Sequence, residues 1–196
     1  MVKFIVGISA VFLLLLIGAY FLPSEFSVQR SQTINAGHGT LYAWVNNLKK
    51  WNEWTAWNNQ KDPTLQVTFG AVTEGKGATQ VWNGKEMGNG KLTITESYPL
   101  EGIKYEMLMN NQFRLNGQIR FTPDLEANRT QVEWITSGSM GNNPVFRYFR
   151  PFLDKWIGTD LEEGLQKLKL LAETAPTQNP DSVLQAPPTM PPATGK

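Results

Sequence analysis

Residues 150–173 read RPFLDKWIGTDLEEGLQKLKLLAE, and this stretch decides the fold class. Its apolar side chains recur at three- and four-residue spacing, at Leu153, Ile157, Leu161, Leu165, Leu168 and Leu171. That period predicts a long amphipathic helix, which Pro151 starts or kinks. Gly158 and Gly164 each cost about 1 kcal/mol relative to alanine inside a helix. A close approach to another element would explain both glycines, and so would a break near Gly158.

The residues before this helix predict the apolar surface that it needs. Alternating apolar and polar side chains, punctuated by Gly, Asn or Pro, predict strands. These segments are residues 26–34, 65–69, 79–82, 92–95, 103–109, 113–121 and 132–136. Gly117 predicts a bulge, and residues 41–57 predict a helix followed by a second short helix or turn. The tight connections imply antiparallel pairing. The predicted class is α+β, a curved antiparallel sheet of about seven strands wrapped around the C-terminal helix, with a gap suited to a ligand.

The two ends of the chain predict appendages to a single domain at residues 24–173. Residues 4–22 carry no charge, and a helix of that length spans roughly 28 Å, close to the apolar thickness of a bilayer. Residues 1–23 therefore predict a transmembrane anchor that ends at Pro23; a cleaved signal peptide is the alternative. Lys3 favours a cytoplasmic N-terminus and a single-pass protein whose domain lies on the extracytoplasmic, periplasmic side. Residues 174–196 are rich in proline and predict a disordered tail.

Composition excludes several classes of function. The chain has no cysteine, which excludes disulfides, thiolate metal sites and cysteine nucleophiles. Its net charge of +1 gives no field that would favour nucleic acid. His38 is the only histidine, and its position in a loop entering a helix favours a surface or capping role. Because the sequence shows no nucleophile beside a base and no metal or cofactor motif, no catalytic residue, metal or cofactor is predicted.

Four segments allow a comparison with known families. They are Arg30-Ser31 with Ile34 and Ala36, leading into the tryptophans at 44, 51, 54 and 57 and Asp62-Pro63; Trp82 and Gly84, then Gly88, Gly90 and residues 93–97; residues 157–169; and the apolar N-terminal stretch. Together they resemble the START-like (SRPBCC) superfamily, and within it a membrane-anchored bacterial subgroup of the polyketide cyclase/dehydrase and lipid-transport branch. The resemblance implies a helix-grip fold. It does not imply one function, because the superfamily includes lipid carriers as well as enzymes. Gly37-His38-Gly39 departs from it, since the family usually has proline there.

Alternating positions on the strands predict the wall of a ligand cavity. The inward candidates from the sheet and from the helix are Tyr105, Met107, Ile119, Phe121, Trp134, Leu153, Trp156 and Ile157. Methionine makes an adaptable wall, and a tyrosine hydroxyl can orient a ligand. The alternative is a filled core without usable space. The tryptophan series favours packing of the helix pair over a stacking platform, and Asp160, Glu162 and Glu163 favour a solvated helix face. Arg147, Arg150 and Lys155 form a basic patch, either an ordinary helix edge or a site for an anionic headgroup.

Three functions remain open at this point. The first is a membrane-anchored binding module for an apolar small molecule or lipid, without its own catalytic set. The second is an enzyme of cyclase or dehydratase type that acts on a bound hydrophobic substrate. The third is an interaction protein with a filled core. A cavity between sheet and helix separates the first two from the third, and convergent ionisable groups within it separate the second from the first.

Overall fold

The computed structural model describes residues 4, 7, 13–14, 16–141 and 144–174. Its elements follow the order β1 (Glu25–Ile34), α2 (His38–Val45), η1 (Leu48–Lys50), α3 (Trp51–Trp54), β2 (Gln66–Phe69), β3 (Thr79–Gly84), β4 (Gly88–Tyr98), β5 (Gly102–Met109), β6 (Phe113–Asp124), β7 (Arg129–Ser139), η2 (Pro144–Phe149) and α4 (Arg150–Thr174). The prediction of seven strands and one long C-terminal helix is confirmed.

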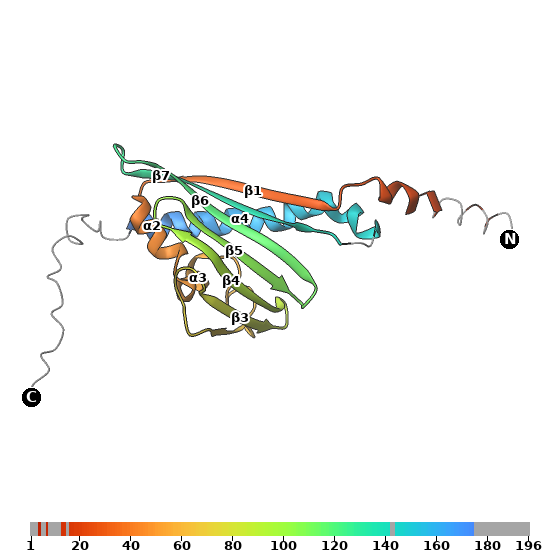
Figure 1. Ribbon diagram of the computed structural model, residues 1–196, viewed down its shortest axis with the longest axis horizontal. Helices are drawn as coiled ribbons and strands as arrows, with labels where there is room; N and C mark the ends of the chain where they lie inside the picture. The colour runs from red at the N-terminus through yellow and green to blue at the C-terminus, as the bar shows by residue number, and fades with distance from the viewer. Residues whose placement is uncertain (1–3, 5–6, 8–12, 15, 142–143, 175–196) are drawn as a thin grey trace, which may run out of the picture.

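The seven strands form one twisted antiparallel sheet in the order β1-β7-β6-β5-β4-β3-β2 (Figure 1). Every neighbouring pair is antiparallel, and β1 forms one edge of the sheet, beside β7. The bulge predicted at Gly117 is wrong, because β5 and β6 pair in continuous register through that residue. The register shifts instead within β4, between Ile94 and Glu96. Gly117 is required for a different reason: the ring of Tyr105 lies directly over it, and a Cβ atom there would be 1.9 Å from Cζ.

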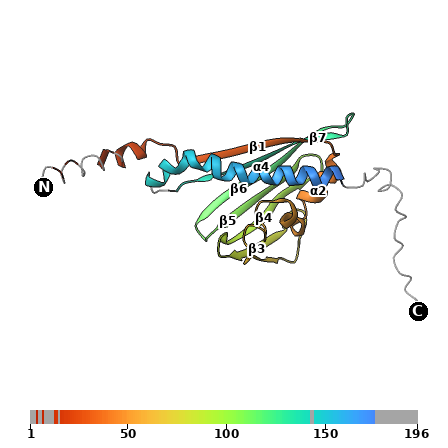
Figure 2. The same ribbon diagram turned by 180° about the vertical axis from the view of Figure 1, so that it is seen from behind.

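Helix α4 lies along one face of the sheet, as the two opposite views show (Figures 1 and 2). It is continuous through Gly158, so the predicted alternative of a break there is wrong. Both glycines mark close approaches. A Cβ atom at Gly164 would be 2.6 Å from Cζ3 of Trp134, and one at Gly158 would be 2.1 Å from Nη2 of Arg30. The helix therefore contacts β7 and β1 without an intervening side chain of its own.

The arginine over Gly158 fastens the helix to the sheet. The Arg30 guanidinium donates to both carboxylate oxygens of Asp154, at 3.0 and 3.1 Å, and also pairs with Glu162. Asp154, Gly158 and Glu162 follow at four-residue spacing, so the guanidinium lies over the glycine between two carboxylates. This position holds the pKa of Arg30 above its ordinary value and lowers the pKa of Asp154.

Core side chains pack between α4 and the sheet toward the end of the domain where β1 ends at Ile34, which we call the distal end. Here the apolar stripe of α4 contributes the buried side chains of Leu161, Leu165 and Leu168. Trp51 and Trp54 are also buried, with Trp54 and Trp134 rings 5.1 Å apart. These contacts agree with the packing role predicted for both tryptophans. The opposite end, where β1 begins at Glu25, is the proximal end.

Residues 16–20 are helical and extend from the proximal end. Arg147 of η2 donates to the backbone oxygens of Tyr20, at 3.0 Å, and Leu22, at 3.1 Å, which caps the end of this helix. Among the described residues, no helix has both the length and the apolar character needed to cross a bilayer. The anchor predicted for residues 1–23 falls partly outside the described residues, and the tail predicted for residues 174–196 falls outside them after Thr174.

Candidate functional site

A cavity of about 630 Å³ lies between the sheet and α4 at the proximal end. Its lining comes from the loop before β2, from β2 to β7 and from the first turns of α4: Trp57, Lys61, Leu65, Val67, Gln80, Trp82, Lys85, Glu86, Met87, Gly88, Leu92, Met107, Met109, Asn110, Leu115, Thr136, Trp156, Ile157 and Asp160. Most of these side chains are apolar. The volume falls within the usual range of about 300–1,000 Å³ for small-molecule sites.

Flexible side chains form much of the apolar wall. Met87, Met107 and Met109 line the cavity on strands and turns that follow one another across the sheet. Methionine has an unbranched, polarizable side chain, so a wall of this composition adapts to ligands of different outline. The cavity therefore favours apolar contact over a fixed pattern of hydrogen bonds.

A row of three paired residues on neighbouring strands leads from the core to the inner end of the cavity. Tyr105, Gly117 and Thr136 are paired across β5, β6 and β7, and the tyrosine ring passes over the glycine. The Trp134 indole N–H donates to the Tyr105 hydroxyl at 2.9 Å. Burial raises the pKa of the Tyr105 phenol to about 12, although its contacts with Trp134 and Thr136 act in the opposite direction. The phenol is therefore neutral at ordinary pH.

Thr136 is the member of this row that lines the cavity. Its side chain is only 1% exposed, and Oγ1 makes no hydrogen bond of normal geometry with a described residue, although its contact with the Tyr105 hydroxyl acts to lower the pKa of that phenol. A buried hydroxyl without such a partner is unfavourable, and a polar group on a bound molecule would satisfy it. The inner end of the cavity thus presents one hydrogen-bonding group within an apolar surface.

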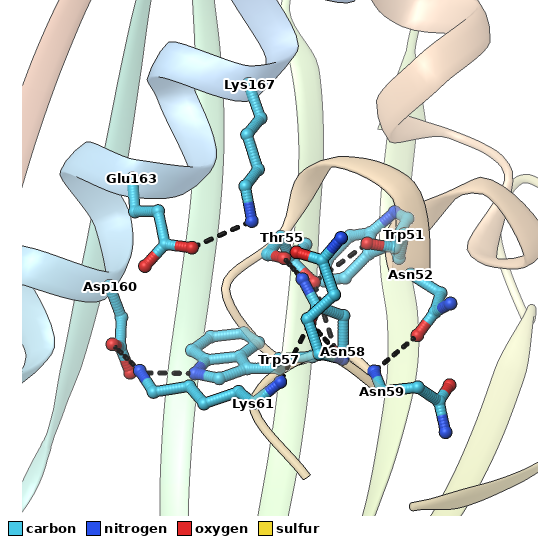
Figure 3. A network of polar contacts seen from close by, with 11 residues as sticks. Trp51, Asn52, Thr55, Trp57, Asn58, Asn59, Lys61, Asp160, Glu163 and Lys167 are labelled. Atoms are coloured by element: carbon cyan, nitrogen blue, oxygen red, sulfur yellow. Dashed lines mark hydrogen bonds and ion pairs between the residues drawn. The ribbon is translucent and has the colours of Figure 1, made fainter. Parts of the chain in front are cut away.

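An acidic side chain of α4 joins the helix to the opposite wall (Figure 3). Asp160 accepts from the Trp57 indole at 3.1 Å and pairs with Lys61. The loop that supplies both partners is held internally, because the Asn58 amide donates to the Thr55 carbonyl at 2.8 Å. Asp160 is therefore a wall residue of the cavity, which corrects the prediction of a solvated face. That prediction holds for Glu162 and Glu163, whose side chains are 60% and 45% exposed. Glu162 pairs with Arg30, and Glu163 pairs with Lys167 four residues later.

A buried carboxylate, that of Asp62, shapes the turn that lines the cavity mouth. Asp62 accepts from the Thr64 hydroxyl at 2.6 Å and from the backbone N–H groups of Glu86 and Met87 at 3.0 Å. These hydrogen bonds, led by that from Thr64, lower the pKa of Asp62 to about 2. Asp62 is thus ionised over the physiological range and fixes the β3–β4 turn against the loop before β2.

The structure divides the predicted wall residues between three places. Met107, Trp156 and Ile157 line the cavity. Tyr105, Ile119, Phe121 and Trp134 belong to the packed core and do not line the cavity. Leu153 lies in a separate groove of about 390 Å³ beside Leu22 and Phe26. The alternation of a strand predicts which face a side chain occupies, but the cavity occupies only the proximal part of that face.

The sequence predicts a different role for two residues that line the cavity, Trp57 and Asp160, and no role in a site for a third, Thr136. Trp57 was grouped with the packing tryptophans, yet it contacts both the Trp134 ring, at 5.7 Å, and the cavity. Asp160 was assigned to solvent and Thr136 only to a strand. The inward parity of Thr136 with Trp134 could have identified it. His38, the only histidine, begins α2 and does not belong to the cavity lining.

Comparison with known families decides the identity of this fold. The profile described as "Polyketide cyclase / dehydrase and lipid transport" matches residues 25–173. The chain belongs to this family. The matched range covers the whole sheet and nearly all of α4, which confirms the START-like resemblance of the sequence. No curated protein matches the chain.

Solved structures show the same fold at low sequence identity. Protein CV1439 from Chromobacterium violaceum is 12% identical, with a TM-score of 0.56, over 76% of this chain and 99% of that one. A hypothetical protein from Helicobacter pylori, jhp0584, is 6% identical, with a TM-score of 0.58, over 75% and 88% of the two chains. The di-domain ARO/CYC StfQ from the steffimycin biosynthetic pathway is 12% identical, with a TM-score of 0.56, over 78% of this chain and 52% of that one.

Proposed function

We propose that this protein binds an apolar small molecule or lipid in the proximal cavity, without a catalytic set of its own. The observation that supports this function best is the cavity of about 630 Å³ with its methionine- and tryptophan-rich wall. The open space between the sheet and α4 also argues against the third function, an interaction protein with a filled core. Burial of apolar surface supplies the affinity, at about 25 cal/mol per Å² removed from water, before the costs of association.

The polar groups of the cavity narrow the class of ligand. A single buried hydroxyl, from Thr136, lies at the inner end, and the Lys61–Asp160 pair lies on the side wall. A ligand that matches this arrangement is elongated or polycyclic and largely apolar, with one hydrogen-bonding group at its inner end. The adaptable methionine wall favours a class of related molecules over one exact shape.

Membrane attachment is the second part of the proposal. The uncharged run of residues 4–22 is long enough to cross a bilayer as a helix, and the domain would then lie on the extracytoplasmic side. Exposed apolar side chains in the described part of this run support attachment: Leu13, Leu14 and Ile17 are each at least half exposed. Such side chains are unfavourable in water and favourable in lipid.

A cyclase or dehydratase activity is the alternative function, and one observation favours it. Asp160 and Lys61 place an acid–base pair on the cavity wall, where a bound substrate would meet it. If these groups perform chemistry, Asp160→Asn should abolish turnover of a bound substrate and leave its binding intact. If they only close the wall, the variant should bind the same molecule and release it unchanged.

Native mass spectrometry of the detergent-extracted full-length protein tests the binding function. We expect an additional mass that corresponds to a co-purified apolar molecule and disappears on denaturation. Met107→Trp, which fills the cavity with an apolar ring, should remove that mass. A wild-type protein that carries no such molecule, and acquires none when it is extracted in the presence of added fatty acid, would contradict the proposal.

A further inference from the structure

The segment that joins the sheet to α4 exposes an unusual number of aromatic rings. We call these side chains, from η2 and the first turns of α4, the aromatic ridge: Phe146, Tyr148, Phe149, Phe152 and Trp156. Each is at least 39% exposed, and Phe152 and Trp156 reach 55% and 60%. The last three follow at three- and four-residue spacing, and the Phe152 and Trp156 rings lie 6.3 Å apart. Contiguous exposed apolar groups of this kind mark an interaction surface.

Basic side chains alternate with these rings. Arg147, Arg150 and Lys155 lie in the same segment, and the last two are exposed. Aromatic rings with arginine and lysine are the composition that favours the interface between lipid headgroups and acyl chains. The positive charges also complement anionic phospholipids. A bilayer surface therefore matches the ridge in both polarity and charge.

The ridge is also joined to the segment proposed to enter the membrane. Besides its hydrogen bonds to the backbone of Tyr20 and Leu22, the Arg147 guanidinium lies 5.7 Å from the centre of the Tyr20 ring. Tyr20 and Phe21 are 75% and 83% exposed, so they extend the aromatic surface to the end of the apolar run. This continuity favours a bilayer over a protein partner as the occupant.

Trp156 connects the ridge to the cavity. It belongs to the exposed aromatic surface and also to the cavity lining, next to Ile157. Other lining residues, Met109, Asn110 and Leu115, lie at the proximal ends of β5 and β6. A membrane in contact with the ridge would therefore adjoin the open end of the cavity.

We propose that the aromatic ridge lies in the headgroup layer of an anionic bilayer, so that the cavity exchanges its ligand directly with that membrane. This inference rests on the proposed function, because it needs both the membrane attachment and an apolar ligand. It adds the source of the ligand and the route by which the ligand enters. Exchange through the lipid phase spares an apolar molecule the cost of crossing water.

Site-specific labelling tests the docking surface in the full-length chain. Because the natural sequence has no cysteine, Phe152→Cys gives a single attachment point for the fluorophore NBD. The matched control is Leu125→Cys, since Leu125 is 72% exposed and lies in the distal hairpin between β6 and β7. Both variants are reconstituted into vesicles of phosphatidylcholine and phosphatidylglycerol that contain a doxyl-labelled lipid quencher. We expect blue-shifted emission and severalfold stronger quenching at position 152 than at position 125.

A separate binding measurement distinguishes this inference from the proposed function. A second measurement follows binding of a fluorescent anthroyloxy fatty acid by the same variants in detergent. If the label at position 152 behaves like that at position 125 while the fatty acid binds, the docking inference fails and the binding function stands. If the label at position 152 is quenched but no fatty acid binds, ligand exchange is refuted and only membrane contact remains. Shielding of position 152 in native membranes but not in pure lipid vesicles would assign the ridge to a protein partner and overturn the proposal.

Discussion

Replacement of Gly164 by alanine tests the close contact between α4 and the sheet. The new Cβ atom would lie 2.6 Å from Cζ3 and 3.4 Å from Cη2 of Trp134, whereas carbon atoms pack best at about 3.5–4.0 Å. The ring has little freedom to withdraw. It is fully buried, its indole N–H is bonded to Tyr105, and Trp54 packs against it. The helix must therefore move away from β7, or the aromatic cluster must rearrange.

The expected loss of stability is the difference between two opposing contributions. Overpacking a well-filled core costs about 1–3 kcal/mol. Alanine is favoured over glycine within a helix by about 1 kcal/mol, which offsets part of that cost. Because the Trp134 ring is held by several partners, we expect Gly164→Ala to lower the free energy of unfolding by about 1–2 kcal/mol. For a domain of this size, that loss corresponds to a decrease in melting temperature of about 2–8 °C.

Gly158→Ala is the matched control on the same helix. Its Cβ atom would meet the end of the Arg30 side chain, which is flexible and partly exposed and can move away. Displacement of the guanidinium weakens two ion pairs with exposed carboxylates, each worth about 0–1 kcal/mol, and the gain in helix propensity of about 1 kcal/mol offsets part of that cost. Thermal unfolding of both variants in one detergent, followed by circular dichroism, gives the comparison. If Gly164→Ala melts no lower than Gly158→Ala, α4 does not contact Trp134 as described.

Three further outcomes follow from the core and the site. Trp54→Ala should lower the free energy of unfolding by about 3–5 kcal/mol, the range for a buried aromatic, and a chemical denaturation curve that matched the wild type would refute its packing role. The pKa of Asp62 is about 2 in the folded state and 3.8 in the unfolded state, so the unfolded chain is protonated at Asp62 before the folded protein is as the pH falls. The contribution of Asp62 to stability is thus present above about pH 3.8 and lost as the pH falls through about 2, so Asp62→Asn should flatten the stability profile in this window; an unchanged profile in acid titrations would oppose it. Thr136→Val should weaken a ligand with a polar inner end by about three- to tenfold, the equivalent of one neutral hydrogen bond, and leave a hydrocarbon probe unaffected in binding titrations; equal losses for both would argue against a specific contact.

The strands and α4 could be predicted from the sequence because their signals are local. Alternation along 103–109 and the three- and four-residue stripe of 150–173 each report the environment of the element that contains them. The glycines show that contacts between elements cannot be predicted from such local patterns. Gly117 suggested a bulge by its residue type, but its cause is the Tyr105 ring, which a neighbouring strand places over it. Contacts of this kind depend on register, which no single segment encodes.

The candidate site was predicted less completely for a related reason. Parity identified Met107 and Tyr105 as inward on the same strand, and both are buried in the core, yet only Met107 also lines the cavity. The difference is the position along the strand relative to α4, which supplies Leu161 and Leu165 at the distal part and leaves space near Ile157. Asp160 was assigned to solvent because its partners, about 100 residues away in the sequence, are brought to it only by the fold.

Photocrosslinking tests the central claim, a ligand bound between sheet and helix, most directly. Full-length protein is illuminated with a diazirine-bearing palmitate, and the labelled peptides are identified by mass spectrometry. The cavity predicts labels around Met107 and Leu115 on the sheet and around Ile157 on α4. Met107→Trp should remove these labels while the melting temperature stays close to that of the wild type. Labels confined to residues 4–22, or an equal yield at the cavity wall in both proteins, would contradict the account.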